Sequence, residues 1–204
     1  MARLSSRKHS NQSNKSSNGS GQVRIIAGQW RGRKLKVLNS EGLRPTTDRV
    51  KETVFNWLSP YLHNSHCLDL FAGSGSLGFE ALSRFASFTT FIEKDALATK
   101  QLKANLQLLN VSSEQANLVN TDALQWLKQR PSEAYDIVFI DPPFRCDLLI
   151  PSCDLLNQRG WLKPDALVYI EFENEALEPQ FPANWTCIKS KQAGQVSYRL
   201  FQSS

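Results

Sequence analysis

The chain has 204 residues, of which 41% are hydrophobic and 21% are charged, and this length and balance suit one globular domain with a substantial core. No apolar run is long enough for a membrane span, and the polar N-terminus lacks the hydrophobic region of a signal peptide, so we expect a cytoplasmic protein without membrane contact. The four cysteines lack C-x-x-C spacing, which favours reduced thiols.

The charge is divided unevenly along the chain. Residues 1–51 contain 12 Lys or Arg and two acids, a net charge of +10, whereas the other 153 residues contain 12 basic and 17 acidic residues, a net charge of −5. A basic end of this kind predicts contact with a polyanion, although a merely solvated tail would look the same. Residues 1–21 are rich in Ser, Asn, Gln and Gly, and we predict a disordered basic tail.

Residues 22–43 are predicted to form a β-hairpin extension, because hydrophobic and polar residues alternate on both sides of a turn at 28–32. Its basic side chains and one tryptophan suit contacts to RNA phosphates and bases, whereas an ordinary edge hairpin would carry lysines that prevent aggregation. The density of arginine favours RNA. The candidate RNA contacts are Arg24, Trp30, Arg31, Arg33, Lys34 and Lys36.

The stretch from Pro45 to Pro60 predicts an amphipathic helix, since apolar residues recur at helical spacing after residues that can cap a helix. The predicted apolar stripe consists of Val50, Val54, Trp57 and Leu58. This helix would lead into the main sheet.

The stretch from Cys67 to Leu82 predicts a strand, a glycine turn and the start of a helix. Its glycines, Gly73, Gly75 and Gly78, match G-x-G-x-x-G, which in a dinucleotide fold faces a pyrophosphate. Asp69, four positions earlier, would repel a pyrophosphate but could bind a cationic amino-acid head group, directly or through water. A turn that is merely rich in small residues is the structural alternative.

The order D-x-F-x-G-x-G, which includes Asp69 and Phe71, resembles motif I of the class I S-adenosylmethionine (SAM) methyltransferases. After it, strand patterns at 88–93, 116–121 and 135–141 alternate with helix patterns. The predicted helices lie at 96–109, 123–129 and 147–157, and they are followed by a turn at 161–165, a strand at 166–172 and a hairpin of 185–190 and 195–201. This alternation predicts an α/β fold with a doubly wound, mostly parallel sheet. In class I methyltransferases such a sheet has seven strands, with an antiparallel strand near the C-terminus.

Acidic residues fall at the carboxyl ends of the predicted strands, where ligands of such sheets bind. Glu93, 24 residues after Asp69, could accept hydrogen bonds from ribose hydroxyls. Asp122 resembles the class I residue that accepts from the adenine amino group, and the alternative is a helix cap. His63, His66 and Cys67 are close in sequence, but no fourth ligand is evident, and we expect no metal.

Asp141-Pro142-Pro143-Phe144 follows the apolar strand pattern Ile137–Ile140. The prolines cannot continue a sheet and remove two backbone donors, leaving acceptors beside a cleft. The Asp141 carboxylate and the Pro142 carbonyl could accept from an exocyclic amino group while Phe144 stacks on the base. The tetrapeptide resembles motif IV of methyltransferases that act on adenine N6, cytosine N4 or guanine N2, in which the aspartate lies at both the cofactor and the substrate.

The stretch R-P-T-x-D-R-V-x-E-x-x-F-N-x-L at 44–58 resembles the segment before motif I in the bacterial RsmD family. The resemblance extends from about Gln22 to the C-terminus and makes residues 44–204 the methyltransferase domain. It implies SAM-dependent methylation of N2 of guanine 966 in 16S ribosomal RNA, within the small ribosomal subunit, and we expect a monomer. Because this segment lies beside the cofactor and substrate pocket in the family, Arg44, Thr46 and Arg49 become candidate RNA contacts.

Three other functions stay open at this stage. A DNA adenine N6 methyltransferase would need the same two motifs, but also a target-recognition region for which the chain has little room. A non-catalytic RNA-binding assembly factor would use the basic hairpin without the D-P-P-F segment. In an NAD-dependent oxidoreductase, the dinucleotide-binding fold would add further parallel βα units at the C-terminal end, where this sequence predicts a hairpin.

Overall fold

The structure is a computed structural model that describes residues 21–38, 48–174 and 178–204. The predicted tail therefore lies almost wholly outside the described residues, as do Arg44 and Thr46. The elements in chain order are β1 Gly21–Arg24, β2 Lys34–Val37, α1 Asp48–Leu58, β3 His66–Asp69, α2 Ser76–Ser83, β4 Phe88–Glu93, α3 Ala96–Leu108, β5 Ala116–Asn120, α4 Ala123–Leu127, β6 Tyr135–Ile140, α5 Leu149–Gln158, β7 Leu162–Glu173, β8 Trp185–Ala193 and β9 Val196–Ser203.

Seven strands form the main sheet in the order β5-β4-β3-β6-β7-β9-β8. Neighbouring strands from β5 to β7 pair in parallel, whereas β9 is antiparallel to both β7 and β8. The predicted α/β fold with its antiparallel C-terminal strands is confirmed. The chain winds outward from β3 in both directions, so β3 and β6 meet at the switch point of the sheet.

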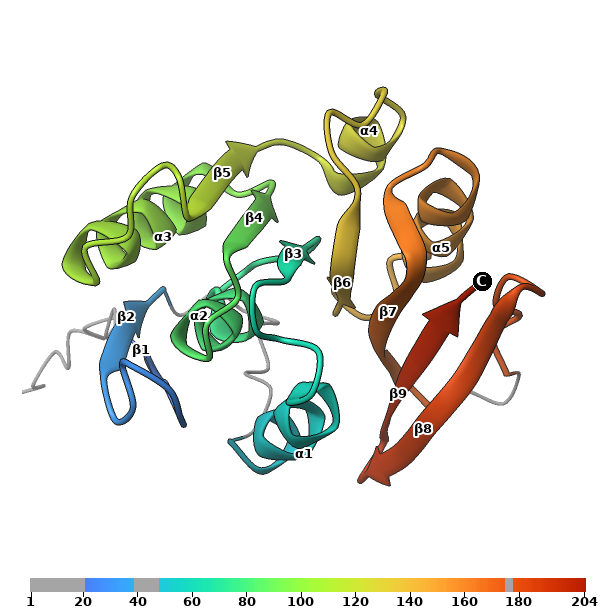
Figure 1. Ribbon diagram of the computed structural model, residues 1–204, viewed down its shortest axis with the longest axis horizontal. Coiled ribbons are helices and arrows are strands. Elements are labelled where there is room, and N and C mark those ends of the chain that lie inside the picture. Colours follow the sequence, from blue (N-terminus) through green and yellow to red (C-terminus); the bar gives the residue numbers. More distant parts are fainter. Residues whose placement is uncertain (1–20, 39–47, 175–177) are drawn as a thin grey trace, which may run out of the picture.

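The helices cover both faces of this sheet: α1, α2 and α3 lie on one side and α4 and α5 on the other (Figure 1). Strand β6 is buried on both faces of the sheet, because its side chains alternate between two core clusters. Ile137 and Phe139 pack in the cluster that contains residues of α1 and α2, whereas Val138 and Ile140 pack in the cluster with α4 and α5. In the described part of the chain, no helix is long and apolar enough to cross a membrane.

The N-terminal hairpin is docked against the helices through buried polar groups. Glu80 of α2 is fully buried, and its carboxylate accepts hydrogen bonds from the backbone N–H groups of Ile26 and Ala27, at 2.8 and 3.0 Å. Lys51 of α1 is also buried; its Nζ donates to the Arg24 carbonyl at 2.6 Å and lies 4.0 Å from Glu80. Burial lowers the pKa of Lys51 despite the nearby Glu80 charge. The hairpin is thereby held to the domain by side chains as well as by apolar packing.

Two details differ from the predictions. The residues of the turn predicted at 161–165 belong mostly to β7, which begins at Leu162, but the ladder is irregular there, because Leu162 pairs with Tyr135 and Leu167 already with Ile137. The extra residues bulge from the strand, which accounts for their turn-like composition. In α1 the buried face includes Lys51 and Phe55 besides the predicted stripe, of which Trp57 is only half-buried.

Candidate active site

The predicted cofactor loop and the D-P-P-F segment meet at the carboxyl edge of the sheet. Asp69, the last residue of β3, pairs with Phe91 of β4 on one side and with Phe139 of β6 on the other. Two residues further along these neighbours are Glu93 and Asp141. The parallel register therefore brings the three acids to one edge, at the switch point where open α/β sheets bind their ligands.

Asp69 lies beneath the glycine loop and is only 2% exposed. Its Oδ2 accepts a hydrogen bond from the Gly78 N–H at 2.9 Å, which stabilises the first turn of α2. Burial raises the pKa of Asp69 to about 7, although the Gly78 hydrogen bond opposes this shift. Asp69 thus supports the loop from below, and a cationic ligand close to it would favour its ionised form.

Packing requires two of the three glycines, Gly75 and Gly78. A Cβ atom at Gly78 would lie 2.2 Å from the Phe91 ring, and one at Gly75 would lie 2.5 Å from Phe79. Gly75 also has a φ of 74°, a left-handed conformation that glycine adopts without strain. Among the described residues, Ser76 Oγ at the start of α2 is one of three buried side-chain polar atoms without a hydrogen-bond partner. The loop therefore holds helix and strand close together and keeps a hydroxyl available to a polar ligand.

Glu93 joins the loop to the end of β4. Its Oε2 accepts from the Gly73 N–H at 2.7 Å, and its Oε1 accepts from the Asp95 N–H at 2.7 Å. A carboxylate oxygen can accept more than one hydrogen bond, so these contacts are compatible with further donors from a ligand.

Asp122 forms the helix cap that was the alternative interpretation of this residue. Its Oδ1 accepts from the Gln125 N–H at 3.1 Å at the start of α4, while Oδ2 lies 3.7 Å from Lys94 Nζ. The adjacent Thr121 N–H donates to the Glu93 carbonyl at 3.0 Å. Asp122 is therefore held at the same edge as Glu93.

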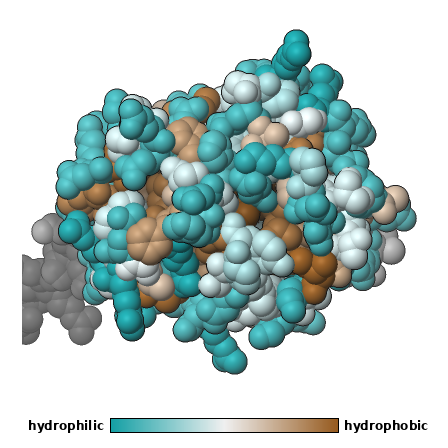
Figure 2. Space-filling model, viewed as in Figure 1, coloured by the Kyte–Doolittle hydropathy of each residue, from teal (hydrophilic) through white to brown (hydrophobic). Residues whose placement is uncertain are grey.

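The D-P-P-F segment borders an open hollow of about 420 Å³ between the end of β6, the start of α5 and the end of β7. Pro142 is buried, whereas Asp141 and Phe144 are half-buried. The following residues Arg145 and Asp147 have φ values of 60° and 50°, a conformation that costs energy for residues with a side chain and is found preferentially at functional sites. Figure 2 shows hydrophobic residues between hydrophilic ones near the middle of the face drawn in Figure 1.

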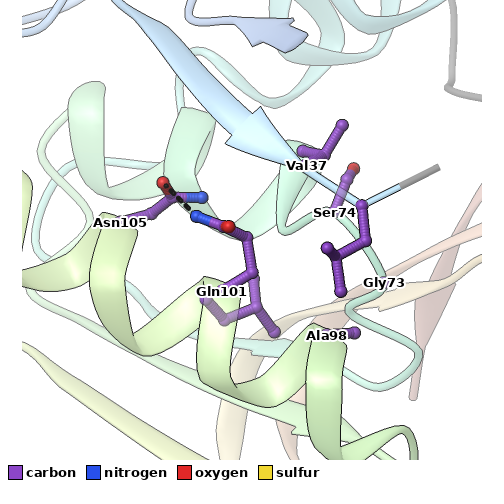
Figure 3. A pocket seen from close by; sticks show the side chains of 8 residues that line it. Val37, Gly73, Ser74, Ala98, Gln101 and Asn105 are labelled. Carbon is purple, nitrogen blue, oxygen red and sulfur yellow. Dashed lines mark hydrogen bonds between the residues drawn. The ribbon is translucent and has the colours of Figure 1, made fainter. Parts of the chain in front are cut away.

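The hairpin reaches the glycine loop from the other side. Val37 and Leu38, at the end of β2, line a small crevice together with Gly73, Ser74 and residues of α3 (Figure 3). The volume of this crevice is about 10 Å³, which is close to that of one water molecule. Asn105 of α3 donates to the Lys36 carbonyl at 2.9 Å and holds the hairpin there. The crevice is thus a packing seam between hairpin and loop.

The predicted RNA contacts of the hairpin point outward with one exception. Arg24, Arg31, Arg33, Lys34 and Lys36 are exposed, as is Arg49 of α1. Arg24 forms an ion pair with Asp48 at 3.0 Å. Trp30 is half-buried, its side chain packs against the core between hairpin, α2 and α3, and its backbone N–H donates to Ser83 Oγ at 3.1 Å. The hairpin therefore presents cations, and its tryptophan takes part in docking.

Comparison with known proteins identifies the family. Residues 23–202 match the family described as "Conserved hypothetical protein 95". The chain is 58% identical to ribosomal RNA small subunit methyltransferase D of Haemophilus influenzae over 91% of its own length and 96% of that protein. The chain belongs to the RsmD family.

Further relatives agree with this membership. The RsmD protein of Escherichia coli K12 is 54% identical over 90% of this chain and 91% of that protein. A solved structure of an Escherichia coli protein assigned as a methyltransferase superposes with a TM-score of 0.84 at 50% identity, and covers 90% of this chain and 99% of that one. The RsmD resemblance predicted from the sequence is confirmed.

Some contributors to the site were not predicted. Tyr169 donates to Glu171 at 2.9 Å, and both side chains are buried on β7 next to the D-P-P-F strand. Burial, the Glu171 charge and the Asp141 charge raise the pKa of Tyr169, so these groups lie close enough to interact. The sequence feature that could have predicted these contributors is the spacing of Glu171 and Glu173. Residues two positions apart lie on the same face of a strand.

Proposed function

We propose that this protein is a SAM-dependent methyltransferase that acts on the exocyclic N2 of a guanine, guanine 966, in the 16S ribosomal RNA of the small ribosomal subunit. One observation carries the proposal: the register of β3 with β4 and β6 brings the glycine loop and the D-P-P-F segment to the switch point of a methyltransferase fold. Membership in the RsmD family supplies the RNA substrate. We also propose that the protein acts as a monomer in the cytoplasm.

The residues of the loop suit SAM. Asp69 beneath the loop and the unpartnered Ser76 hydroxyl suit the charged amino-acid end. Glu93 would accept from the ribose hydroxyls, and Asp122 would hold the adenine amino group. The other residues of the proposed cofactor set are Phe71, Gly73, Gly75, Gly78 and Asp141, the last of which would also face the substrate. When bound, SAM supplies an activated methyl group.

The D-P-P-F segment would hold the substrate nitrogen for a direct displacement. The Asp141 carboxylate and the Pro142 carbonyl accept the two N2 hydrogens, and Phe144 stacks on the base. These hydrogen bonds would localise the nitrogen lone pair and direct it at the methyl group that bound SAM would supply. The Asp141 carboxylate, which accepts one of the N2 hydrogens, would take the proton that the methylated nitrogen loses and pass it to solvent. Positioning and electrostatics supply most of the acceleration.

The basic hairpin would contact the RNA backbone through Arg24, Arg31, Arg33, Lys34 and Lys36, with Trp30 at its turn. The family resemblance adds Arg44, Thr46 and Arg49 to the proposed RNA contacts. The exposed cations of the hairpin and its contact with the glycine loop support this role. RNA bound there would lie beside the proposed cofactor site.

The test is transfer of labelled methyl from SAM to small ribosomal subunits that lack the modification, followed by nucleoside digestion and mass spectrometry. We expect N2-methylguanosine at one position. Methylation of adenine instead would support the N6 alternative, and SAM binding without any transfer would support an assembly factor. DNA and naked 16S RNA are the comparison substrates.

A further inference from the structure

Glu173, the last residue of β7, lies beside the D-P-P-F segment. Strands β6 and β7 are parallel, with Ile140 opposite Ile170. Three residues after Ile140, beyond the end of β6, is Pro143, and three residues after Ile170 is Glu173; both line the hollow of about 420 Å³. Glu173 and the segment that would hold the substrate amino group thus border the same space.

Glu173 and Asp141 project from the same face of the sheet. Phe139 of β6 and Tyr169 of β7 pack in one core cluster, with ring centroids 6.3 Å apart. Side chains along a strand alternate between faces, so Asp141 follows Phe139 on this face and Glu173 follows Tyr169. The two residues therefore lie on the same face of the sheet, and Glu173 lines the hollow next to the segment that begins with Asp141.

The contacts of Glu173 leave it able to bind a ligand. Its Oε2 lies 3.5 Å from Nε of Arg145, whose side chain is 83% exposed. A pair at this distance with an exposed arginine contributes little stability and exchanges readily. Glu178 in the same hollow differs, because its carboxylate accepts a hydrogen bond from Arg199, which lowers the pKa of Glu178.

A carboxylate at this place discriminates between bases by their hydrogen-bond donors. Guanine carries the N1–H next to its N2 amino group, whereas adenine and cytosine have an acceptor nitrogen next to their amino groups. A carboxylate only accepts hydrogen bonds, so it repels an acceptor placed against it. A site built to hydrogen-bond one donor rejects analogues that lack it far more strongly than an apolar pocket does.

We propose that Glu173 accepts the N1–H of the target guanine while Asp141 and the Pro142 carbonyl accept the N2 hydrogens, so that Glu173 selects guanine among the amino-bearing bases. This assignment rests on the proposed function and deepens it. It supplies the base selectivity that the D-P-P-F tetrapeptide alone leaves undecided.

The test compares two substrates that share the N2 amino group but differ at N1 and at the neighbouring 6-substituent. Small subunits are reconstituted with 16S RNA that carries either guanine or 2,6-diaminopurine at the target position, since diaminopurine keeps the N2 amino group but has an acceptor at N1. We expect the wild-type protein to prefer guanine by about a hundredfold in kcat/KM. In Glu173→Gln the amide can donate to diaminopurine N1, and the preference should fall by at least about tenfold.

Two further variants make the comparison decisive. Asp147→Asn makes the same change at an exposed carboxyl group that lines the same hollow from the loop after β6, and it should leave the preference unchanged. Glu173→Asp keeps the charge on a shorter side chain; it should lower kcat/KM for guanine about tenfold while guanine stays preferred. SAM binding and thermal unfolding are measured for every variant, so that a folding defect is recognised.

The two possible failures are distinguishable. If the wild-type protein methylates guanine N2 but a folded, SAM-binding Glu173→Gln keeps the full preference, the role of Glu173 is overturned. Wild-type rates in Glu173→Asp overturn it as well. If the wild-type protein transfers no methyl group to guanine N2, the proposed function itself fails.

Discussion

The loop after β3 and the loop after β6 lie at the same edge of the sheet but are stabilised differently. The glycine loop is stabilised by buried groups: Asp69 lies beneath it, and the Phe91 ring packs against Gly78. The loop after β6 borders an open hollow and contains residues with positive φ, Arg145 and Asp147. We therefore expect substitutions in the first loop to affect folding and cofactor binding, and substitutions in the second loop to affect methyl transfer.

The largest expected effect is on methyl transfer in Asp141→Ala. This change removes the carboxylate that would hold the N2 amino group. The rate of methyl transfer should fall by about a hundredfold to a thousandfold. SAM affinity, measured by titration calorimetry, should stay within about threefold of the wild-type value, because the glycine loop does not depend on the hollow. Equal loss of binding and transfer would mean that the two loops are not separable.

Asp69→Asn tests the burial of Asp69 beneath the glycine loop through the pH dependence of stability. In the unfolded chain the carboxyl group has its ordinary pKa of 3.8, and folding raises it to about 7. The stability contribution of the protonated group is therefore fully present below pH 3.8 and is lost as pH rises to about 7, at about 1.4 kcal/mol per unit. The free energy of unfolding is measured by urea denaturation between pH 4 and 8. Relative to the wild-type protein, that of the Asn variant should rise by up to about 4 kcal/mol as the pH increases over this window. A pH-independent difference would contradict the burial of a titrating Asp69.

Glu80→Gln tests whether buried polar groups also hold the hairpin. Glu80 lies beside Arg84, whose Nε donates to it at 2.8 Å, and beside Lys51, so removing its charge leaves two cations uncompensated. Stability should fall by about 3 kcal/mol. Trypsin should also cleave faster at Arg31 and Arg33. Glu114→Gln, an exposed acid elsewhere, is the control, and equal cleavage rates in both variants would argue against the docking role.

The smallest expected effect is in Glu93→Ala, which removes the acceptor proposed for the ribose hydroxyls and two hydrogen bonds to Gly73 and Asp95. SAM affinity should weaken by about tenfold, the loss of roughly one charged hydrogen bond. Glu114→Ala is the matched control. An unchanged dissociation constant would remove Glu93 from the cofactor site.

The succession of strands and helices along the chain, the glycine loop and the acids at the strand ends were all predictable from the sequence. These features depend on local periodicity and on residues such as Gly75 whose backbone conformation needs glycine. The RsmD family was also recognisable from residues 44–58 together with motifs I and IV. The one misassigned segment, 161–165, carries turn-like residues inside an irregular strand.

The burial of particular polar residues and the position of Glu173 at the hollow depend on the tertiary structure. Lys51 looks like a solvated helix residue until Glu80 and the Arg24 carbonyl are brought to it by separate elements. Trp30 looks like an exposed turn residue until the hairpin docks against α2 and α3. Glu173 lies 32 positions after Asp141, and the β6–β7 ladder brings it to the hollow. Burial and ladder pairing depend on partners distant in the chain, which local patterns do not encode.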